Sequence, residues 1–173
     1  TYGFMLFDPS STFESVRENV AFLKRITTDG DVPAVFCRML PYAGTPIEER
    51  LAKEGRLRGS VDNPDYDFLD ARLNSYFEAL NHLVADWIQG SDALVSQLNF
   101  AWQEYWVIRR LFPPVAGLQA YERFLRSITR RSNDFLLNLV GEVGHAFEDG
   151  HGRVPSAAEV QPEAALFQLL TER

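Results

Sequence analysis

Residues 38–57, "RMLPYAGTPIEERLAKEGRL", predict the end of a strand, a tight turn and a short helix with well-defined ends. Thr45 is suited to the N-cap position, Pro46 to the first helical position, and Glu48 to a capping box. Gly55 stands where glycine commonly ends a helix. This stretch therefore predicts a β-strand that leads directly into a capped α-helix.

A similar unit precedes this stretch. "TYGFMLFD" at residues 1–8 is a near-continuous apolar run, which is typical of a strand covered on both faces. Ser11, with Glu14 three residues later, predicts the start of a helix. The apolar stripe of that helix comprises Phe13, Val16, Val20 and Leu23, widened by Phe22 and Ile26. A second strand is predicted over 34–40, and this strand–helix–strand–helix order is typical of a parallel α/β sheet or barrel.

The pattern becomes helical after about residue 60. The segment 59–67 is polar and has no strand pattern, so it is predicted to be a connector. The following helices are predicted over 68–88, from Ser91 to 112, over 118–150 with a bend at Ser132–Asp134 or at Gly141 and Gly144, and over 162–170. We therefore expect two parts: residues 1–60 with βα units and residues 61–173 as a helical extension.

Composition limits the possible partners and compartments. The net charge of −7 is not offset by any basic stretch, which argues against a nucleic-acid or anionic-membrane surface. No apolar run approaches the ~20 residues that span a bilayer, and no signal-peptide pattern is present. We therefore expect a cytoplasmic protein. Its single cysteine, Cys37, excludes an internal disulfide and any multi-cysteine metal site, and a small core role suits it better than a nucleophilic one.

The two βα units resemble a known family. "YGFMLFDPSSTFESVRENVAFLKRI" and "RMLPYAGTPIEERLAKEGRLRG" resemble the late barrel strands of radical S-adenosylmethionine (SAM) enzymes. They are similar, more narrowly, to the class that carries an N-terminal cobalamin (B12)-binding domain. The first family pattern is met by Gly3, Phe4, Met5, Leu6, Pro9, Thr12, Glu14, Asn19, Phe22 and Leu23, and the second by Pro41, Tyr42, Gly44, Thr45, Pro46, Leu51, Glu54, Gly55 and Leu57. The resemblance covers roughly residues 1–85.

This resemblance implies a fold and a set of cofactors. The chain would supply the last two βα units of a partial (β/α)6 TIM-like barrel, followed by an α-helical C-terminal extension. The parent protein would be an Fe-S oxidoreductase or methyltransferase that uses SAM, a [4Fe-4S] cluster held by a C-x-x-x-C-x-x-C loop, and cobalamin. Because Cys37 is the chain's one cysteine, the cluster loop is expected N-terminal to Thr1. The chain alone is then expected to bind none of these cofactors and to be inactive.

The resemblance also assigns roles to residues of the first strand. Side chains alternate along a strand, so Gly3, Met5 and Phe7 share one face. The family places a glycine and an apolar residue of this strand against the adenine of SAM, which implies Gly3 and Met5 here. Phe7 stands where the family has a second glycine. Asp8, at the C-terminal end of the strand, would bond a ligand hydroxyl; the alternative reading makes Met5 and Phe7 core residues and Asp8 a turn residue.

The second strand supplies the remaining candidates. In the family, the loop that corresponds to Pro41 and Tyr42 touches adenine through its backbone; the alternative is a plain turn. Arg38 must find a partner if it is buried, so it either clamps a carboxylate or phosphate of the substrate or reaches solvent at a sheet edge. The substrate, a small molecule or a peptide, is not identified by any motif.

A different function is also open. The chain can be a helical protein-interaction or scaffold module without catalysis, with an aromatic groove as its binding surface. Two strands alone make a marginal sheet, so their open edge would pair either with strands from the N-terminal part of the protein or with another copy of the chain.

Overall fold

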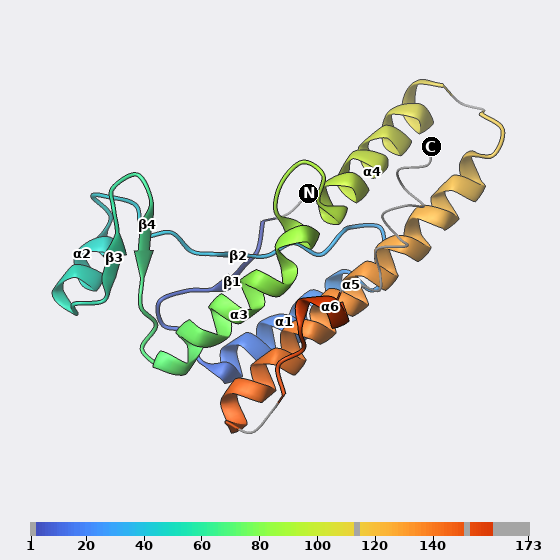
Figure 1. Cartoon of the computed structure of the whole chain (residues 1–173). Coiled ribbons are helices and arrows are strands. Elements are labelled where there is room, and N and C mark those ends of the chain that lie inside the picture. Colours follow the sequence, from blue (N-terminus) through green and yellow to red (C-terminus); the bar gives the residue numbers. More distant parts are fainter. Residues whose placement is uncertain (1–2, 113–114, 151–152, 161–173) are drawn as a thin grey trace.

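The computed structural model describes residues 3–112, 115–150 and 153–160, and it is rich in helix with few short strands (Figure 1). The strands are β1 (Met5–Phe7), β2 (Cys37–Arg38), β3 (Leu57–Gly59) and β4 (Pro64–Tyr66). The helices are α1 (Phe13–Ile26), α2 (Pro46–Lys53), α3 (Ala71–Ile88), α4 (Leu94–Leu111), α5 (Leu118–Asp149) and α6 (Ala157–Val160). The helix-rich α/β character is confirmed. The strands of the described residues pair only as two separate two-stranded sheets.

The first sheet has the predicted parallel arrangement. β1 and β2 are parallel and are joined through α1, with Met5 opposite Cys37 and Phe7 opposite Arg38. The amide of Cys37 donates to the Phe4 carbonyl over 2.9 Å. Within the described residues both strands are shorter than the predicted ranges 2–8 and 34–40, and the pairing register shifts between Met5 and Phe7.

The two helix starts differ in how well they were predicted. α2 begins as expected, because Thr45 Oγ1 accepts a hydrogen bond from the Glu48 amide over 3.3 Å. α1 begins one residue later than expected. Thr12, and not Ser11, is its N-cap, and Thr12 forms a reciprocal capping box with Ser15 in place of Glu14. Ser11 is instead used in the turn, where its Oγ accepts a hydrogen bond from the Asp8 amide over 2.8 Å.

The prediction of a strandless connector over 59–67 was wrong. β3 and β4 form an antiparallel hairpin in which Leu57 is opposite Tyr66 and Gly59 is opposite Pro64. Gly59 has a φ of 75°, and a Cβ at this position would lie 2.1 Å from the Asn63 carbonyl oxygen. Glycine is therefore required for the tight turn, and three-residue polar strands have too short a pattern to be recognised.

The helical part is built around α5, which packs against α1, α3 and α4 (Figure 1). α5 is one continuous helix of 32 residues, so the predicted bends at Ser132–Asp134 and at Gly141 and Gly144 are absent. α4 starts at Leu94, with Ala93 as an N-cap that makes no side-chain bond, rather than near Ser91. The helix predicted over 162–170 lies outside the described residues. None of the described helices has the length and apolarity needed to cross a membrane.

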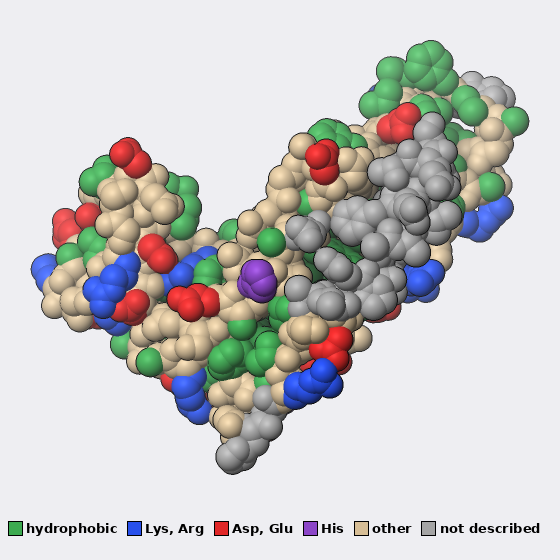
Figure 2. All heavy atoms as spheres, in the orientation of Figure 1, with side chains coloured by type: hydrophobic (Ala, Val, Ile, Leu, Met, Phe, Trp, Pro, Cys, Tyr) green, Lys and Arg blue, Asp and Glu red, His purple; other side chains and the backbone are tan. Residues whose placement is uncertain are grey.

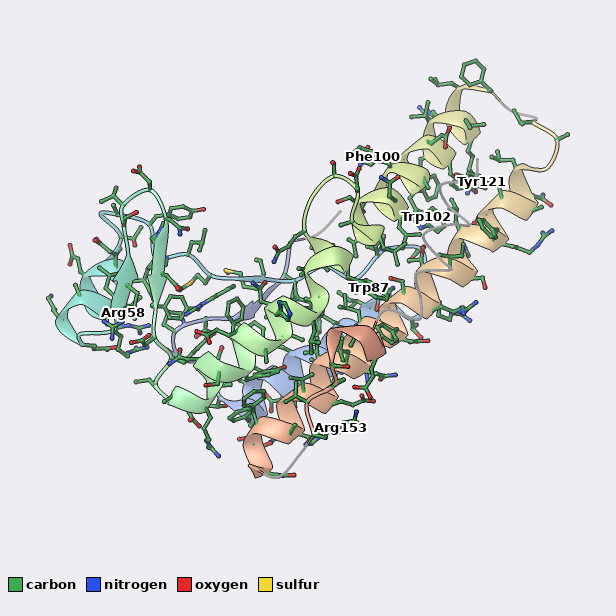
Figure 3. The ribbon with its side chains drawn as sticks, in the orientation of Figure 1. Arg58, Trp87, Phe100, Trp102, Tyr121 and Arg153 are labelled. Atoms are coloured by element: carbon green, nitrogen blue, oxygen red, sulfur yellow. The ribbon has the colours of Figure 1, made fainter. Side chains whose placement is uncertain are left out.

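Buried polar side chains on α5 hold neighbouring segments. Trp102 of α4 donates its indole Nε1–H to Thr129 over 3.0 Å, and Trp87 of α3 donates to Ser132 over 3.4 Å. Asn133 bonds the main chain between α1 and β2. Figure 3 shows the side chains of Trp87 and Trp102 directed towards α5. Ser132 and Asn133, two of the expected bend residues, are therefore attachment points in a continuous helix.

The main hydrophobic core joins both parts of the chain. It contains Leu6 of β1, Val20 of α1, Leu73 of α3 and Val140 of α5 in one cluster. A smaller cluster of Trp102, Tyr105 and Leu125 lies between α4 and α5. The expected boundary at residue 60 falls within the β3–β4 hairpin, and the main cluster takes residues from both sides of it.

Candidate functional site

The strand β1 presents two different environments along one face. Gly3 and Met5 are exposed, with 57% of Met5 accessible, and a Cβ on Gly3 would meet no atom within 4 Å. Phe7, two residues further on, is fully buried. Its ring lies 5.6 Å from that of Tyr76 and 5.3 Å from that of Phe77, measured between ring centroids. Gly3 and Met5 are thus open to a ligand, whereas Phe7 is enclosed by α3.

The turns that follow the two strands are also partly open. Asp8 is exposed, and its Oδ1 accepts a hydrogen bond from the Ser10 amide over 2.6 Å. This bond is a local turn interaction that leaves the second carboxylate oxygen available. After β2, Pro41 is buried and Tyr42 is 63% exposed. The Tyr42 carbonyl accepts the Thr45 hydroxyl over 2.6 Å, which fixes the turn before α2.

Arg38 is surrounded by three aromatic rings and a carboxylate. Its guanidinium carbon lies 4.0, 4.6 and 4.7 Å from the ring centroids of Tyr66, Phe68 and Phe77. Only 12% of the side chain is exposed, and its Nη1 forms an ion pair with Asp65 Oδ1 at 2.9 Å. A further hydrogen bond runs from Nη2 to the Tyr66 carbonyl. The buried alternative therefore describes Arg38 better than the solvent-exposed one, and its partners come from the β3–β4 hairpin.

Two buried polar atoms near this ion pair lack partners. Among the described residues, Arg38 Nε and the Tyr66 hydroxyl are buried without a hydrogen bond. Burial raises the pKa of Tyr66 to about 12, although the nearby Arg38 guanidinium opposes part of this rise. The neutral Tyr66 phenol and the Arg38 guanidinium are therefore polar groups enclosed in an aromatic cluster. Such an arrangement fixes the position of the Arg38 side chain against the hairpin.

A cavity of about 250 Å³ lies between β2 and α3. Arg38 and Cys37 contribute to its wall from β2, and Asn81 and Gln89 contribute from α3. Gln89 Nε2 donates to Asn81 Oδ1 over 2.6 Å, so these two amides form one polar edge of a mainly apolar space. This cavity offers room for a small, largely apolar group beside the strand that carries Arg38.

A second cavity of about 280 Å³ lies between the turn after β2 and the hairpin, where Pro41, Glu48 and Arg58 contribute to its wall. Figure 3 shows Arg58 on this hairpin, which stands apart from the main helical body. The predicted site residues therefore do not form one site: Arg38 lines the first cavity and Pro41 lines the second. Gly3, Met5 and Asp8 line neither cavity.

The sequence interpretation missed the residues that surround Arg38. Asp65 and Tyr66 belong to the segment that was predicted to be a connector, and Phe68 is the first residue of the helix predicted over 68–88. The one signal for them is the run "DYDF" at residues 65–68, in which aromatic and acidic residues alternate. Aromatic rings and carboxylates are the side chains that a guanidinium contacts favourably, so the run offers partners to a buried arginine.

Within the described residues no group of three or more His, Cys, Asp or Glu side chains is arranged to hold a metal ion. Comparison with protein-family models, with curated proteins and with solved structures finds no match to this chain.

Proposed function

We propose that β1–α1–β2–α2 are the last two βα units of a radical SAM barrel and that the following helices cap its substrate. The observation that carries the proposal is the open parallel pair β1–β2. One face of β1 packs on α1 through Leu6, while Gly3 and Met5 on the other face are exposed. Barrel enzymes place their ligands at the C-terminal ends of the strands, where Asp8 is also exposed.

The free edge of β1 supports this proposal. Within residues 3–112, 115–150 and 153–160, β1 pairs with β2 alone, so its second edge has no strand partner. Next to it, Phe22 and Ile26 of α1 are about 40% exposed, and the ring of Phe22 stacks on that of Phe4 at 5.5 Å. An open strand edge beside exposed apolar side chains matches a surface against which another βα unit packs.

The residues of this chain suit SAM better than they suit an iron–sulfur cluster. Three cysteine thiolates are needed for the cluster, and the chain has only Cys37, so the cluster would be held by another part of the protein. SAM bound to such a cluster supplies a 5′-deoxyadenosyl radical in this family. Gly3 and Met5 would contact the adenine, Asp8 would accept a hydrogen bond from a hydroxyl, and the main chain at Pro41 and Tyr42 would border the site.

Two of the candidate residues take supporting positions in this proposal. Phe7 is enclosed by α3, so it would stabilise the strand from behind rather than touch SAM. Arg38 is held by Asp65 and by three aromatic rings, and it would present one wall of the substrate cavity between β2 and α3. Cobalamin, if the parent protein uses it, would be bound by a separate domain.

The first test is genetic and biochemical. The proposal predicts that the gene encodes a C-x-x-x-C-x-x-C motif on the N-terminal side of Thr1, and a gene without this motif would contradict it. The 173-residue chain alone is expected to show no heat of SAM binding by titration calorimetry. The intact protein, purified without oxygen, is expected to cleave SAM to 5′-deoxyadenosine under reducing conditions.

The second test addresses the assigned residues in the intact protein. Met5→Glu places a charge against the expected adenine position and is expected to weaken SAM binding at least tenfold. Val61→Glu is the matched control, because Val61 is 78% exposed on the β3–β4 hairpin and has no assigned role. Equal SAM affinity in both variants would show that Met5 is not in the adenine site.

One observation favours the alternative function as an interaction module. Large apolar side chains are exposed along α4 and just after it, and Figure 2 shows hydrophobic side chains at the far end of the α4–α5 hairpin. They are Phe100, Trp106, Val107, Leu111, Phe112 and Val115. In Figure 3, Phe100 points away from α5, while Trp102 lies between the two helices.

The occupant that we propose for this alternative is a second copy of the chain. Arg109 and Arg110 flank the apolar surface, and the chain's 24 acidic residues against 17 basic ones offer carboxylates on a second copy that can pair with them. Light scattering is expected to show a concentration-dependent dimer that Val107→Glu removes and that Leu69→Glu, a control at an exposed apolar residue outside this surface, retains. A monomer at all concentrations would rule this alternative out.

A further inference from the structure

A narrow apolar groove lies between α1 and α5, with Tyr76 of α3 at its floor. Its volume is about 210 Å³. The floor is formed by buried side chains of α1 and by Val140 of α5, and the groove shares no lining residue with the two cavities near β2 and the hairpin. It is therefore a separate place on the molecule from the proposed SAM and substrate site.

The shape of the groove follows from its lining residues. On α1 they extend from Phe13 to Lys24, which is about 16 Å along the helix axis at 1.5 Å per residue. The volume equals that of roughly seven water molecules in the liquid. A space that is this long and this small accommodates one unbranched chain of roughly six to eight carbon atoms, and not a bulky ring system.

Two glycines leave the groove open on the side formed by α5. Gly141 and Gly144 line it from within α5, although glycine is the least favourable residue after proline in a helix interior. A Cβ on Gly141 would meet no atom within 4 Å, so no neighbouring side chain demands a glycine there. A Cβ on Gly144 would come within 3.4 Å of the Tyr76 hydroxyl oxygen. Longer side chains at either position would occupy the groove.

The charged groups at the rim determine the sign of a ligand. Arg17 forms an ion pair with Glu148, so the charge at that position is neutralised. Lys24, further along α1, instead bonds the neutral Oδ1 of Asn138 over 2.7 Å. His145 of α5 also lines the groove. The end of the groove at Lys24 therefore carries a positive charge that is balanced by no acidic partner in this contact.

We propose that this groove binds a medium-chain carboxylic acid, with its alkyl chain along Val16, Val20 and Gly141 and its carboxylate at Lys24. The alkyl chain would replace solvent over the apolar floor, which is the main source of affinity for such a ligand. The carboxylate would accept a charge-assisted hydrogen bond from the Lys24 ammonium group. The proposal is independent of the radical SAM assignment, since neither βα unit's open face takes part in it.

Octanoate is the probe that tests this proposal on the full 173-residue chain. Saturable binding is expected in titration calorimetry and in ligand-observed NMR. n-Octylamine, which has the same chain and the opposite charge, is expected to bind at least tenfold more weakly. Equal binding of the two probes, or no saturable binding of octanoate, would overturn the proposal.

Two variants locate the site. Gly141→Leu fills the groove and is expected to weaken octanoate binding at least tenfold while the melting temperature stays equal or rises, because leucine favours helix. Lys24→Met is expected to weaken binding about tenfold, as expected for loss of one charge-assisted hydrogen bond. Lys53→Met on α2 is the matched control and is expected to bind normally. If Gly141→Leu fails to fold, the comparison of Lys24→Met with Lys53→Met decides, and equal binding by these two variants overturns the proposal.

Discussion

Replacing Asn133 by alanine is expected to be among the most destabilising polar substitutions in this protein. Asn133 lies on α5 with 2% of its surface exposed. Its Oδ1 accepts the amide of Ala34 over 2.7 Å, and its Nδ2 donates to the carbonyls of Val32 and Thr27 over 2.9 and 3.3 Å. One side chain therefore satisfies three main-chain groups in the segment that leads from α1 into β2.

The expected magnitude follows from these three bonds. Each typical intramolecular hydrogen bond contributes about 0.5–1.5 kcal/mol net, and a buried group left without a partner costs about 1–3 kcal/mol. Because Ala34 is fully buried, its amide cannot turn to water in the variant. Asn133→Ala should therefore lower the free energy of unfolding by about 3 kcal/mol. For a chain of this length that corresponds to a melting temperature lower by roughly 6–12 °C.

Urea denaturation followed by tryptophan fluorescence and by circular dichroism measures this change. The matched control is Asn138→Ala, five positions further along α5, whose exposed side chain bonds only Lys24 in the described structure. It is expected to cost less than about 0.5 kcal/mol. The Ala34 amide should also lose its protection from hydrogen exchange in Asn133→Ala. A loss below about 1 kcal/mol, with that protection retained, would refute the reasoning.

Three further predictions concern the aromatic cluster and the core. Tyr66→Phe should change the free energy of unfolding at pH 7 by less than about 0.5 kcal/mol, because the Tyr66 hydroxyl has no partner. Tyr76→Phe loses a 2.8 Å hydrogen bond to a carbonyl of α5 and should cost about 1 kcal/mol. Equal costs of the two substitutions in urea denaturation would contradict this. The pKa of Tyr66 rises from 10.0 to about 12 in the folded protein, so the neutral phenol stabilises the fold fully below pH 10, and this contribution is lost as the pH rises through 12. Melting temperatures measured between pH 10 and 12 should therefore fall less steeply in Tyr66→Phe than in the native protein, and parallel curves would count against the assignment. Arg38→Met removes the ion pair with Asp65 and the aromatic contacts and should cost about 2–3 kcal/mol of unfolding free energy. Arg58→Met, at a more exposed ion pair on the β3–β4 hairpin, should cost less than about 1 kcal/mol. Similar losses for the two variants in urea denaturation would disprove the buried role of Arg38.

Local chemistry in the sequence predicts the βα units well. At the start of α2, Thr45 and Pro46 adopt the expected positions, while the Glu48 carboxylate accepts a hydrogen bond from the Gly44 amide and not from the N-cap amide. The start of α1 was displaced by one residue because Ser11 and Thr12 are both good N-cap residues. The turn after β1 uses Ser11 to hold the Asp8 amide, and this leaves Thr12 as the cap. A choice between two equivalent neighbours is made by contacts that are not visible in the local pattern.

The surroundings of Arg38 are harder to predict for a different reason. The β3–β4 hairpin supplies the carboxylate partner of Arg38 and one of its three rings, and Phe68 just after the hairpin supplies a second ring. These residues lie 27 to 30 positions later in a segment with no clear strand period. The need for a partner was predicted from the sequence, but the partner's identity depends on a turn that Gly59 permits. The partners of Ser132 and Asn133 are also distant in sequence. Their polar side chains suggested a bend in the helix, whereas in the structure they form hydrogen bonds with Trp87 and with the main chain of Ala34.

The contact between Asn133 and the segment before β2 also bears on how the chain folds as it leaves the ribosome. Ala34 is synthesised 99 residues before the side chain that satisfies its amide. During that interval the α1–β2 segment lacks its acceptor and Val20 lacks the covering residues of α5, so native contacts at the N-terminal end await the C-terminal helix. Contacts of such large sequence separation slow folding and leave apolar strands exposed meanwhile. Nascent chains released before residue 133 should accordingly be recognised by chaperones and proteases as unfolded, whereas slightly longer ones that include all of α5 should resist digestion.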